Sequence, residues 1–310
     1  MAEGQRRAVV TGASGFIGTA LVRHLRAEGW GVVAVDRKPF PDPDQPARLV
    51  DVAREGALDG LLDDRTVVFH MAASADVAAS VANPRHDFEN TFRGVFEVLE
   101  AARQTGCRVV FPSTASIFDT SNALPLKERA FPRPTSPYAA GKLGGEAYCH
   151  AYHRSYGVDV RIARLFSVYG VGMFRFAIHD IVRKIQRSRE ELTILGDGTQ
   201  VRDYLFIDDA VRGLALVATA GASGEEYNVA SGEPVRLMDL ALLIAELMGC
   251  PDIRICPTGR SFAGDTARWY ADIAKARGIG FEPRVDLRTG LERTIAWLAT
   301  RPLNVAAAAP

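Results

Sequence analysis

A tyrosine and a lysine four residues apart, in the stretch Tyr138-Ala-Ala-Gly-Lys142, are the pair best suited to acid–base chemistry in this 310-residue sequence. On a helix, residues four apart lie on one face, so the phenol and the ammonium point the same way. A nearby cation favours the phenolate and lowers the tyrosine pKa from its usual value of about 10. The spacing therefore predicts that Tyr138 is a general base tuned by Lys142. The same spacing also occurs by chance on surface helices, so the pair needs support from its surroundings.

Polar side chains follow two apolar runs that are typical of buried strands. Ser113 and Thr114 come directly after the run 107–112, where a hydroxyl can share a hydrogen bond with a substrate oxygen and with the phenol. His70 ends the run 66–70. We interpret His70 as a structural, hydrogen-bonded histidine rather than a catalyst.

Three glycines, Gly12, Gly15 and Gly18, lie where a short apolar run meets an amphipathic pattern. The run 8–11 is typical of a strand, and the pattern from residue 16 to 29 is typical of a helix. Without Cβ atoms the backbone can turn tightly, let a pyrophosphate approach the helix N-terminus and bring helix close to strand. The glycines therefore predict a dinucleotide site.

The next expected strand, 31–35, supplies a second part of that site. Asp36 follows it, and its carboxylate can accept hydrogen bonds from a ribose 2′-hydroxyl. The same carboxylate would repel a 2′-phosphate, although Arg37 beside it adds a positive charge. The sequence thus favours NAD over NADP as the cofactor.

Alternating strands and helices must position these groups. Further strands are expected at 66–70, 107–112 and 158–165, and further helices at 87–103 and 137–156. This alternation predicts an α/β fold, a doubly wound parallel sheet with helices on both faces, in which ligands bind at the carboxyl ends of the strands. Ser136 and Pro137 suit the N-cap and the first helical position, so Tyr138 should lie in the first turn of its helix.

The spacing of the pattern loosens beyond residue 166, with one more helix expected near 174–187. We therefore predict a dinucleotide-binding Rossmann domain over 1–166 and a smaller C-terminal α/β substrate domain over 167–310. Some segments, about 200–230, are expected to return to the first domain.

The composition argues against several classes of binding partner. Lysine plus arginine and aspartate plus glutamate both total 37, so no net field favours nucleic acid or an anionic membrane. No run of about 18 apolar residues predicts a membrane span. The four cysteines have no Cys-x-x-Cys spacing, which argues against a metal site or a disulfide framework. They are Cys107, Cys149, Cys250 and Cys256. We expect a cytoplasmic protein with reduced thiols.

These stretches together resemble the extended short-chain dehydrogenase/reductase family, specifically its NAD-dependent nucleotide-sugar epimerase/dehydratase branch. The matching stretches are Thr11–Gly18, His70–Ala73, Ser113–Phe118, Tyr138–Lys142 and the downstream run GDGTQVRDYLFIDDA. The resemblance covers nearly the whole chain. It implies tightly held NAD, a nucleotide-sugar substrate and a homodimer formed through helices 87–103 and 137–156.

The resemblance also implies roles for individual residues. Tyr138 matches the family's base, Lys142 the lysine that holds the nicotinamide ribose, and Thr114 the hydroxyl that binds the sugar. The implied cofactor-binding residues are Gly12, Ser14, Gly15, Phe16, Ile17, Gly18, Asp36, Arg37, Asp51, Val52, Ala72, Ala73, Tyr138 and Lys142. The implied substrate-binding residues are Asp76, Thr114, Ser167, Arg202 and Arg260. Arg202 matches the arginine that clamps the substrate diphosphate. The alternative interpretation is that Arg202 forms a surface salt bridge with Asp203 or Asp208.

The sequence departs from the family pattern at several positions. Ala115-Ser116 replaces the Asp-Glu pair with which dehydratases eliminate water, so dehydration would lack its acid and base. Ser167 and Thr91 each stand where the family has an asparagine. Phe262 takes the place of an arginine before Ala263-Gly264-Asp265, with Arg260 two residues earlier, so the phosphate contacts are expected to be rearranged.

The function predicted from the sequence is an NAD-dependent nucleotide-sugar epimerase that acts at C4 through a transient 4-keto sugar, without net redox. A reductase, oxidase or decarboxylase of the same family remains open, because all share Tyr138, Lys142 and the cofactor loop. A non-catalytic cofactor-binding scaffold or regulator also remains open, although the intact tyrosine and lysine oppose it.

Overall fold

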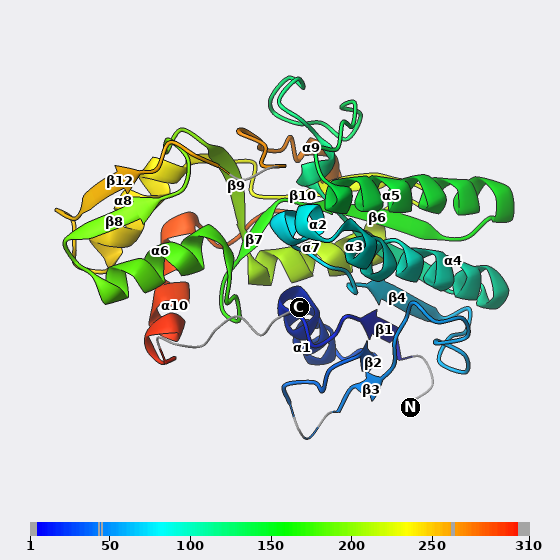
Figure 1. The fold of residues 1–310 in the computed structure, drawn as a ribbon. Coiled ribbons are helices and arrows are strands. Elements are labelled where there is room, and N and C mark those ends of the chain that lie inside the picture. Colours follow the sequence, from blue (N-terminus) through cyan, green and yellow to red (C-terminus); the bar gives the residue numbers. More distant parts are fainter. Residues whose placement is uncertain (1–4, 43, 45, 262–263, 303–310) are drawn as a thin grey trace.

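The computed structural model describes residues 5–42, 44, 46–261 and 264–302 (Figure 1). Within this part of the chain seven parallel strands form the central sheet: β1 (Arg7–Thr11), β2 (Gly31–Asp36), β3 (Arg48–Leu49), β4 (Thr66–His70), β5 (Arg108–Thr114), β6 (Val160–Leu165) and β10 (Glu226–Val229). Their order is β10-β6-β5-β4-β1-β2-β3. The chain thus runs outward in one direction from β1 and in the other from β4. The expected doubly wound fold is confirmed, and its topological switch point lies between β1 and β4.

Helices cover both faces of this sheet. They are α1 (Phe16–Ala27) and α7 (Ile207–Ala220) on one face, and α4 (Arg93–Thr105) and α5 (Pro137–Tyr156) on the other. Neighbouring side chains of β1 point to opposite faces, so Val10 packs in the first cluster and Val9 in the second. Burial on both faces explains why the strands are continuous apolar runs rather than alternating ones.

The helix expected at 137–156 is confirmed as α5. Its N-cap is Ser136, whose Oγ accepts a hydrogen bond of 3.2 Å from the backbone N–H of Ala139. Gly157 ends the helix in the left-handed conformation, with φ of 71°. Tyr138 therefore lies in the first turn, as the cap predicts.

The prediction of one helix over 87–103 is wrong. The segment forms α3 (Pro84–Thr91) and α4, which are separated at Phe92 and preceded by the short α2 (Val77–Ala82). The backbone tightens at Phe92, where the N–H of Val95 donates to the Phe92 carbonyl three residues back. Gly94 lies directly after this break, and a Cβ there would come 3.3 Å from the His70 ring, so α4 begins pressed against β4.

The remaining elements gather on the other side of the molecule (left in Figure 1). They are β7 (Ser167–Tyr169), α6 (Phe176–Arg187), β8 (Glu191–Ile194), β9 (Val201–Phe206), β11 (Pro234–Arg236), α8 (Leu237–Leu247), β12 (Arg254–Pro257) and α10 (Leu287–Ala299), whereas α9 (Ala274–Gly278) packs against β10 of the central sheet. β11, β9 and β7 form a three-stranded sheet, and β12 pairs with β8.

The two sides of the molecule share one apolar core. A continuous buried cluster includes Val10 of β1, Ile181 of α6 and Leu291 of α10. α7 packs on the central sheet and β10 pairs with its strand β6. The division at residues 166 and 167 stays a prediction. No helix in the described ranges is long and apolar enough to cross a membrane.

Candidate active site

The glycine turn after β1 has room for backbone alone. Gly12 has a positive φ of 62°, and a Cβ on it would come 2.5 Å from the backbone nitrogen of Ala72. A Cβ on Gly18 would overlap the Gly12 carbonyl. Gly15 is the N-cap residue of α1 and supplies no side-chain cap, so the first N–H groups of the helix remain available. This cradle fits a pyrophosphate, and it includes the predicted residues from Gly12 to Gly18.

Asp36 fixes the end of β2 beside that turn. Its Oδ2 accepts a hydrogen bond of 2.9 Å from the backbone of Ser14, and its Oδ1 accepts one of 2.9 Å from the backbone of Lys38. The Ser14 hydroxyl donates to the Lys38 carbonyl at 3.0 Å. Each carboxylate oxygen can accept further hydrogen bonds, so Asp36 remains able to bind a ribose hydroxyl.

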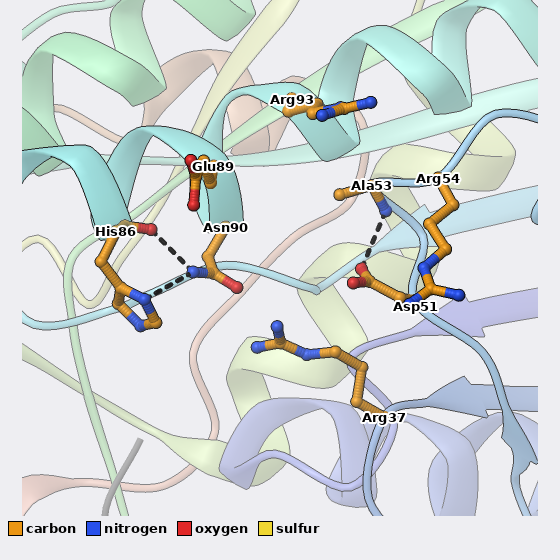
Figure 2. Close-up of a pocket in the computed structure, with 8 residues that line it drawn as sticks. All are labelled: Arg37, Asp51, Ala53, Arg54, His86, Glu89, Asn90 and Arg93. Carbon is orange, nitrogen blue, oxygen red and sulfur yellow. Dashed lines mark hydrogen bonds between the residues drawn. The ribbon is translucent and has the colours of Figure 1, made fainter.

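A pocket of about 320 Å³ opens next to Asp36. Figure 2 shows it between the segment 51–54 and the end of β2 on one side and α3 and α4 on the other. Its lining residues are Arg37, Asp51, Ala53, Arg54, His86, Glu89, Asn90 and Arg93. Arg37 and Asp51 were predicted to bind the cofactor, and the predicted Val52 is buried between them and the core. Its size and place fit the adenosine half of a dinucleotide.

Sequence reasoning missed most of the lining of this pocket. No sequence motif includes the other lining residues, and only the folded chain brings α3 and α4 to the pocket. These residues are Arg54, His86, Glu89, Asn90 and Arg93. The guanidinium groups of Arg37, Arg54 and Arg93 form no hydrogen bond or ion pair with any other residue that the structure describes. Unpaired guanidinium groups suit stacking on a base and contact with an anionic ligand.

His70 occupies the switch point between β1 and β4. Its Nδ1 lies 2.9 Å from Oγ1 of Thr11, which in turn accepts a hydrogen bond of 3.3 Å from the backbone of Ala72. Nε2 of His70 is buried without a hydrogen-bond partner in the described chain. Burial lowers the pKa of His70 to about 3, so the ring is neutral. This arrangement supports the structural interpretation of His70 and holds Ala72 and Ala73 over Gly12.

The Lys142 side chain contacts strand β5 beneath its helix. Its Nζ donates a hydrogen bond of 2.8 Å to the Pro112 carbonyl and lies 4.9 Å from the centre of the Phe111 ring. The residue is only 4% exposed, and this burial lowers the pKa of Lys142 to about 8.

The prediction that Lys142 lowers the pKa of Tyr138 is wrong for this arrangement. Burial raises the pKa of Tyr138 to about 12, and the charge of Asp87 raises it further. A hydrogen bond with Thr114 and the charge of Arg175 act in the opposite direction. Sequence reasoning missed both Asp87 and Arg175. Their influence depends on how α3 and the segment before α6 pack against α5.

The Thr114 hydroxyl stands at the carboxyl end of β5, beside a second hydroxyl. Its Oγ1 accepts a hydrogen bond of 3.2 Å from the backbone of Ser116 and donates one of 3.2 Å to the Ser116 hydroxyl. These bonds cap a short 3-10 helix over Ala115–Ile117. The neighbouring Ser113 Oγ is buried without a hydrogen-bond partner in the described chain. The carboxyl end of the strand thus carries the hydroxyl groups of Ser113 and Thr114, and their part in the reaction stays a prediction.

The predicted substrate residues are more scattered. Asp76 caps α2 by accepting a hydrogen bond of 2.9 Å from the backbone of Ala79. Ser167 begins β7 and is half-buried. Arg260 has an exposed side chain, and its carbonyl accepts from the backbone of Gly196. Phe262 and Ala263 lie outside the described residues.

Arg202 is engaged within the chain, with a partner that the sequence did not indicate. Its Nη2 pairs with Oδ1 of Asp265 at 2.5 Å, rather than with Asp203 or Asp208. Its guanidinium carbon lies 4.2 Å from the centre of the Trp269 ring. The pairing connects β9 with the stretch after Ala263, which sequence spacing alone could not reveal.

Comparisons with known proteins show the family of the chain. Residues 8–230 match the family model described as "NAD dependent epimerase/dehydratase family". The chain is 31% identical to the UDP-glucose 4-epimerase of Mycolicibacterium smegmatis, over 95% of this chain and 99% of that protein. A UDP-N-acetylglucosamine 4-epimerase from Methanobrevibacter ruminantium, solved with UDP-N-acetylmuramic acid, superposes with a TM-score of 0.88 at 28% identity, covering 95% of this chain and 98% of that one. MoeE5, solved with UDP-glucuronic acid and NAD, gives a TM-score of 0.85 at 34% identity, covering 94% and 99%.

Proposed function

The chain belongs to the NAD-dependent epimerase/dehydratase family and is an NAD-dependent epimerase of nucleotide sugars, and we propose that it inverts C4 of a UDP-hexose or UDP-hexuronic acid. The observation that carries the proposal is that Thr114, at the carboxyl end of β5, and Tyr138, in the first turn of α5, lie at the same edge of the sheet as the glycine turn of β1. The replacement of the dehydratase Asp-Glu pair by Ala115-Ser116 supports epimerisation over dehydration.

In this proposal Tyr138 moves the proton of the sugar 4-hydroxyl. The phenolate accepts that proton as the 4-keto sugar forms and returns it after the sugar has turned over, so no proton is gained or lost. Thr114 donates a hydrogen bond to the same oxygen. Lys142, whose Nζ donates to the Pro112 carbonyl, would contact the nicotinamide ribose. NAD, when bound, supplies the acceptor and the donor for the hydrogen on C4.

The residues that would hold the cofactor follow from the geometry above. The uncapped N-terminus of α1 would bind the pyrophosphate, and Asp36 would bind the ribose hydroxyls. Asp51 and the arginine-lined pocket would hold adenine.

We propose that Arg202 contacts the diphosphate of the substrate. Its pairing with Asp265 and its stacking on Trp269 fix the plane of the guanidinium. Nη1 donates to the carbonyls of Val201 and Ala267, so Nε and the second N–H of Nη2 are left for phosphate oxygens. Anchoring the diphosphate would let the sugar rotate between the two hydrogen transfers while the nucleotide stays bound.

The proposed activity is tested by incubating the protein, without added nicotinamide, with UDP-, GDP-, CDP- and dTDP-sugars and analysing the products. We expect one pair of C4 epimers to interconvert with no net change in absorbance at the nicotinamide band. Accumulation of reduced cofactor, or release of carbon dioxide from a hexuronic acid, would instead establish an oxidase or a decarboxylase. No turnover of any sugar nucleotide would support the scaffold alternative.

We also propose a homodimer formed through α3, α4 and α5. A row of aromatic rings in mutual contact follows these helices: Phe88, Phe92, Phe96, Tyr148, Tyr152 and Tyr156. Phe88 is 56% exposed and Tyr156 is 60% exposed, so the row forms an apolar surface that a second copy can cover. Light scattering at micromolar protein should give twice the mass of the chain, and Phe88→Ser should weaken the association.

We propose that the enzyme works in the cytoplasm. Cys107, Cys149, Cys250 and Cys256 are all free thiols, which suits a reducing compartment. Finding the protein in an oxidising compartment by fractionation of its native cells would contradict this proposal.

A further inference from the structure

Asp87 is a buried carboxylate with few partners. The residue is only 2% exposed, yet its side chain accepts one hydrogen bond, of 3.3 Å to Oδ1 from the Thr91 hydroxyl. No group in the described chain donates to Oδ2, and no cation forms an ion pair with it within 4 Å. Burying a carboxylate in this way costs free energy unless other groups pair with its charge, because burial removes the hydration that stabilises the charge.

Oδ2 of Asp87 faces α5 at the turn that carries the reactive pair. A Cβ added to Gly141 would come 3.9 Å from Oδ2 and 3.4 Å from Cγ2 of Thr91. Gly141 lies three residues after Tyr138, a spacing that shares one helix face, and it belongs to the turn that ends at Lys142. The absence of a side chain at residue 141 lets the carboxylate pack against this turn.

The Asp87 carboxylate also acts on both partners through its charge. Burial is the largest influence on all three groups, raising the pKa of Asp87 and Tyr138 and lowering the pKa of Lys142. Beyond burial, the negative charge of Asp87 raises the pKa of Tyr138 and of Lys142. It therefore favours the phenol over the phenolate and the ammonium over the amine.

The other groups that face this centre come from several elements. Lys142 also feels Glu146 and Cys149 on α5 and in turn acts on His70 at the end of β4. Tyr138 also feels Thr114 at the end of β5 and Arg175 before α6. Asp87 also feels His86 on its own helix. Among these groups only Asp87 shifts the pKa of both Tyr138 and Lys142. Its charge therefore couples the ionisation of the phenol to that of the ammonium.

Thr91 connects this carboxylate with the end of β4. Its Oγ1 accepts a hydrogen bond of 3.2 Å from the backbone of Ser74, one residue after Ala73. Thr91, which stands where the family has an asparagine, thus bonds to Asp87 on one side and to the segment that follows Ala73 on the other.

We propose that Asp87 is a positioning residue for the epimerase, a fixed negative charge that acts through Tyr138 and Lys142 and holds this pair as phenol and ammonium until the ligands bind. The proposal rests on the proposed function only in giving Tyr138 the proton transfer. The electrostatic coupling itself can be measured without any turnover.

The experiment compares Asp87→Asn, which keeps the shape and removes the charge, with the wild-type protein. Tyrosinate absorbance, corrected with Tyr138→Phe in each background, gives the titration of Tyr138 directly. We expect Asp87→Asn to move it to lower pH by about one unit, the effect of one nearby charge. Both limbs of the kcat profile should move to lower pH, because the phenol ionises more readily and the ammonium is lost sooner.

Two further variants separate this role from a structural one. Thr91→Val removes the hydrogen bond and keeps the charge, so the tyrosinate titration should stay within about 0.3 pH units of wild type. Glu97→Gln removes one negative charge from α4 and should move neither limb. An unchanged tyrosinate titration in a folded Asp87→Asn protein would overturn the proposal. A shifted titration together with an inactive wild-type protein would instead overturn the proposed function.

Discussion

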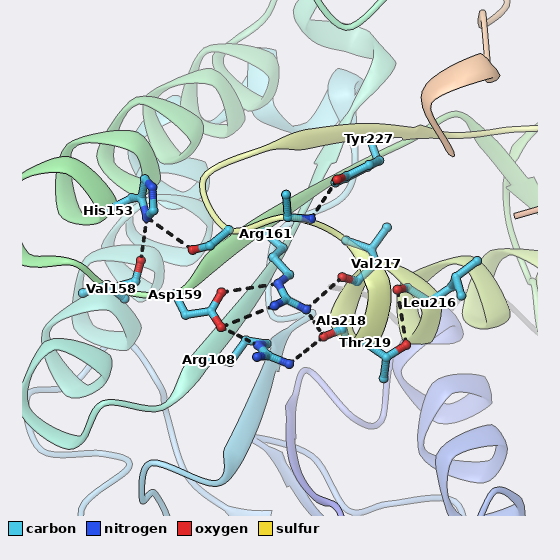
Figure 3. Close-up of polar contacts among 12 residues, drawn as sticks. Arg108, His153, Val158, Asp159, Arg161, Leu216, Val217, Ala218, Thr219 and Tyr227 are labelled. Carbon is cyan, nitrogen blue, oxygen red and sulfur yellow. Dashed lines mark hydrogen bonds and ion pairs between the residues drawn. The ribbon is translucent and has the colours of Figure 1, made fainter. Parts of the chain in front are cut away.

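The strands β5 and β6 carry ionic groups at both of their ends, and the two ends use them differently. At the amino end, Asp159 lies 2.6 Å from Nε of Arg108 and 3.3 Å from Nε of Arg161 (Figure 3). Both guanidinium groups also donate to the Ala218 carbonyl in the last turn of α7. Cations are favourable at a helix C-terminus, so each charge at this end has a partner that stabilises it.

At the carboxyl end Arg164 of β6 is paired with Glu146, but other polar groups there have no partner. Ser113 Oγ and, on the adjacent strand β4, His70 Nε2 are buried without a partner in the described chain. Asp87 accepts one hydrogen bond, and Tyr138 and Lys142 are both displaced in pKa by burial. Buried atoms without a hydrogen bond occur at both ends, since Asp159 Oδ1 and Arg161 Nε also lack one in the described chain. The carboxyl end differs in the displaced pKa values of Tyr138 and Lys142, which are typical of an edge that binds ligands.

The comparison predicts that substitutions at the carboxyl end change turnover without changing stability. Tyr138→Phe should lower kcat by about 10²- to 10⁴-fold, the usual value of a positioned proton-transfer group. The thermal unfolding midpoint and NAD binding should stay close to wild type, because no described residue depends on the phenol for its packing. Turnover of the identified sugar nucleotide, measured beside thermal unfolding and cofactor titration, checks this. A folded Tyr138→Phe protein with near wild-type kcat would remove Tyr138 from the reaction.

The amino end should respond in the opposite way. Asp159→Asn leaves Arg108 and Arg161 without their shared anion and should lower the free energy of unfolding by about 1 to 3 kcal/mol, with kcat little changed. Urea unfolding measures the loss. The surface pair of Arg236 and Asp239 gives a matched control, since Asp239→Asn should cost less than about 1 kcal/mol.

The pH dependence of this loss of stability follows from the direction in which folding shifts the pKa of Asp159. Burial opposes ionisation, but Arg108 and Arg161 outweigh it and hold the pKa of Asp159 below its ordinary value. A carboxyl whose pKa is depressed by folding contributes stability above its unfolded pKa of about 3.9, and this contribution is lost as the pH falls through the folded value. The difference between wild type and Asp159→Asn should therefore shrink below about pH 4. A difference that stayed constant there would mean that the charge of Asp159 does not stabilise the fold.

Local sequence rules were sufficient where the determining residues are neighbours. The Ser136 cap, the first-turn place of Tyr138 and the Gly12 turn each depend on a few consecutive residues, and the structure has all three. The parallel order of the sheet also followed from the alternation of patterns.

The same rules failed where distant segments meet. The partner of Arg202 is 63 residues away, and the carbonyl that Arg108 binds is 110 residues away. The break at Phe92 depends on the packing of Gly94 against β4, and the pKa of Tyr138 depends on burial and on α3. A sequence pattern gives the type of an element but not the neighbours that decide the charge balance of a buried group.

The smallest expected effect concerns Thr114, which belongs to the carboxyl end but is already engaged with Ser116. Thr114→Val removes one hydrogen bond to the substrate oxygen, worth about 0.5 to 1.5 kcal/mol, so kcat should fall by only about 2- to 12-fold. Thr114→Ser keeps the hydroxyl and should retain most of the activity. The Ser116 backbone would lose its cap in the valine variant alone, so a loss of stability there would show that the 3-10 helix depends on this cap. If Thr114→Val and Thr114→Ser lowered kcat equally, the hydroxyl would have no part in turnover. The functional difference between the two ends would then depend on Tyr138, Lys142 and Asp87 alone.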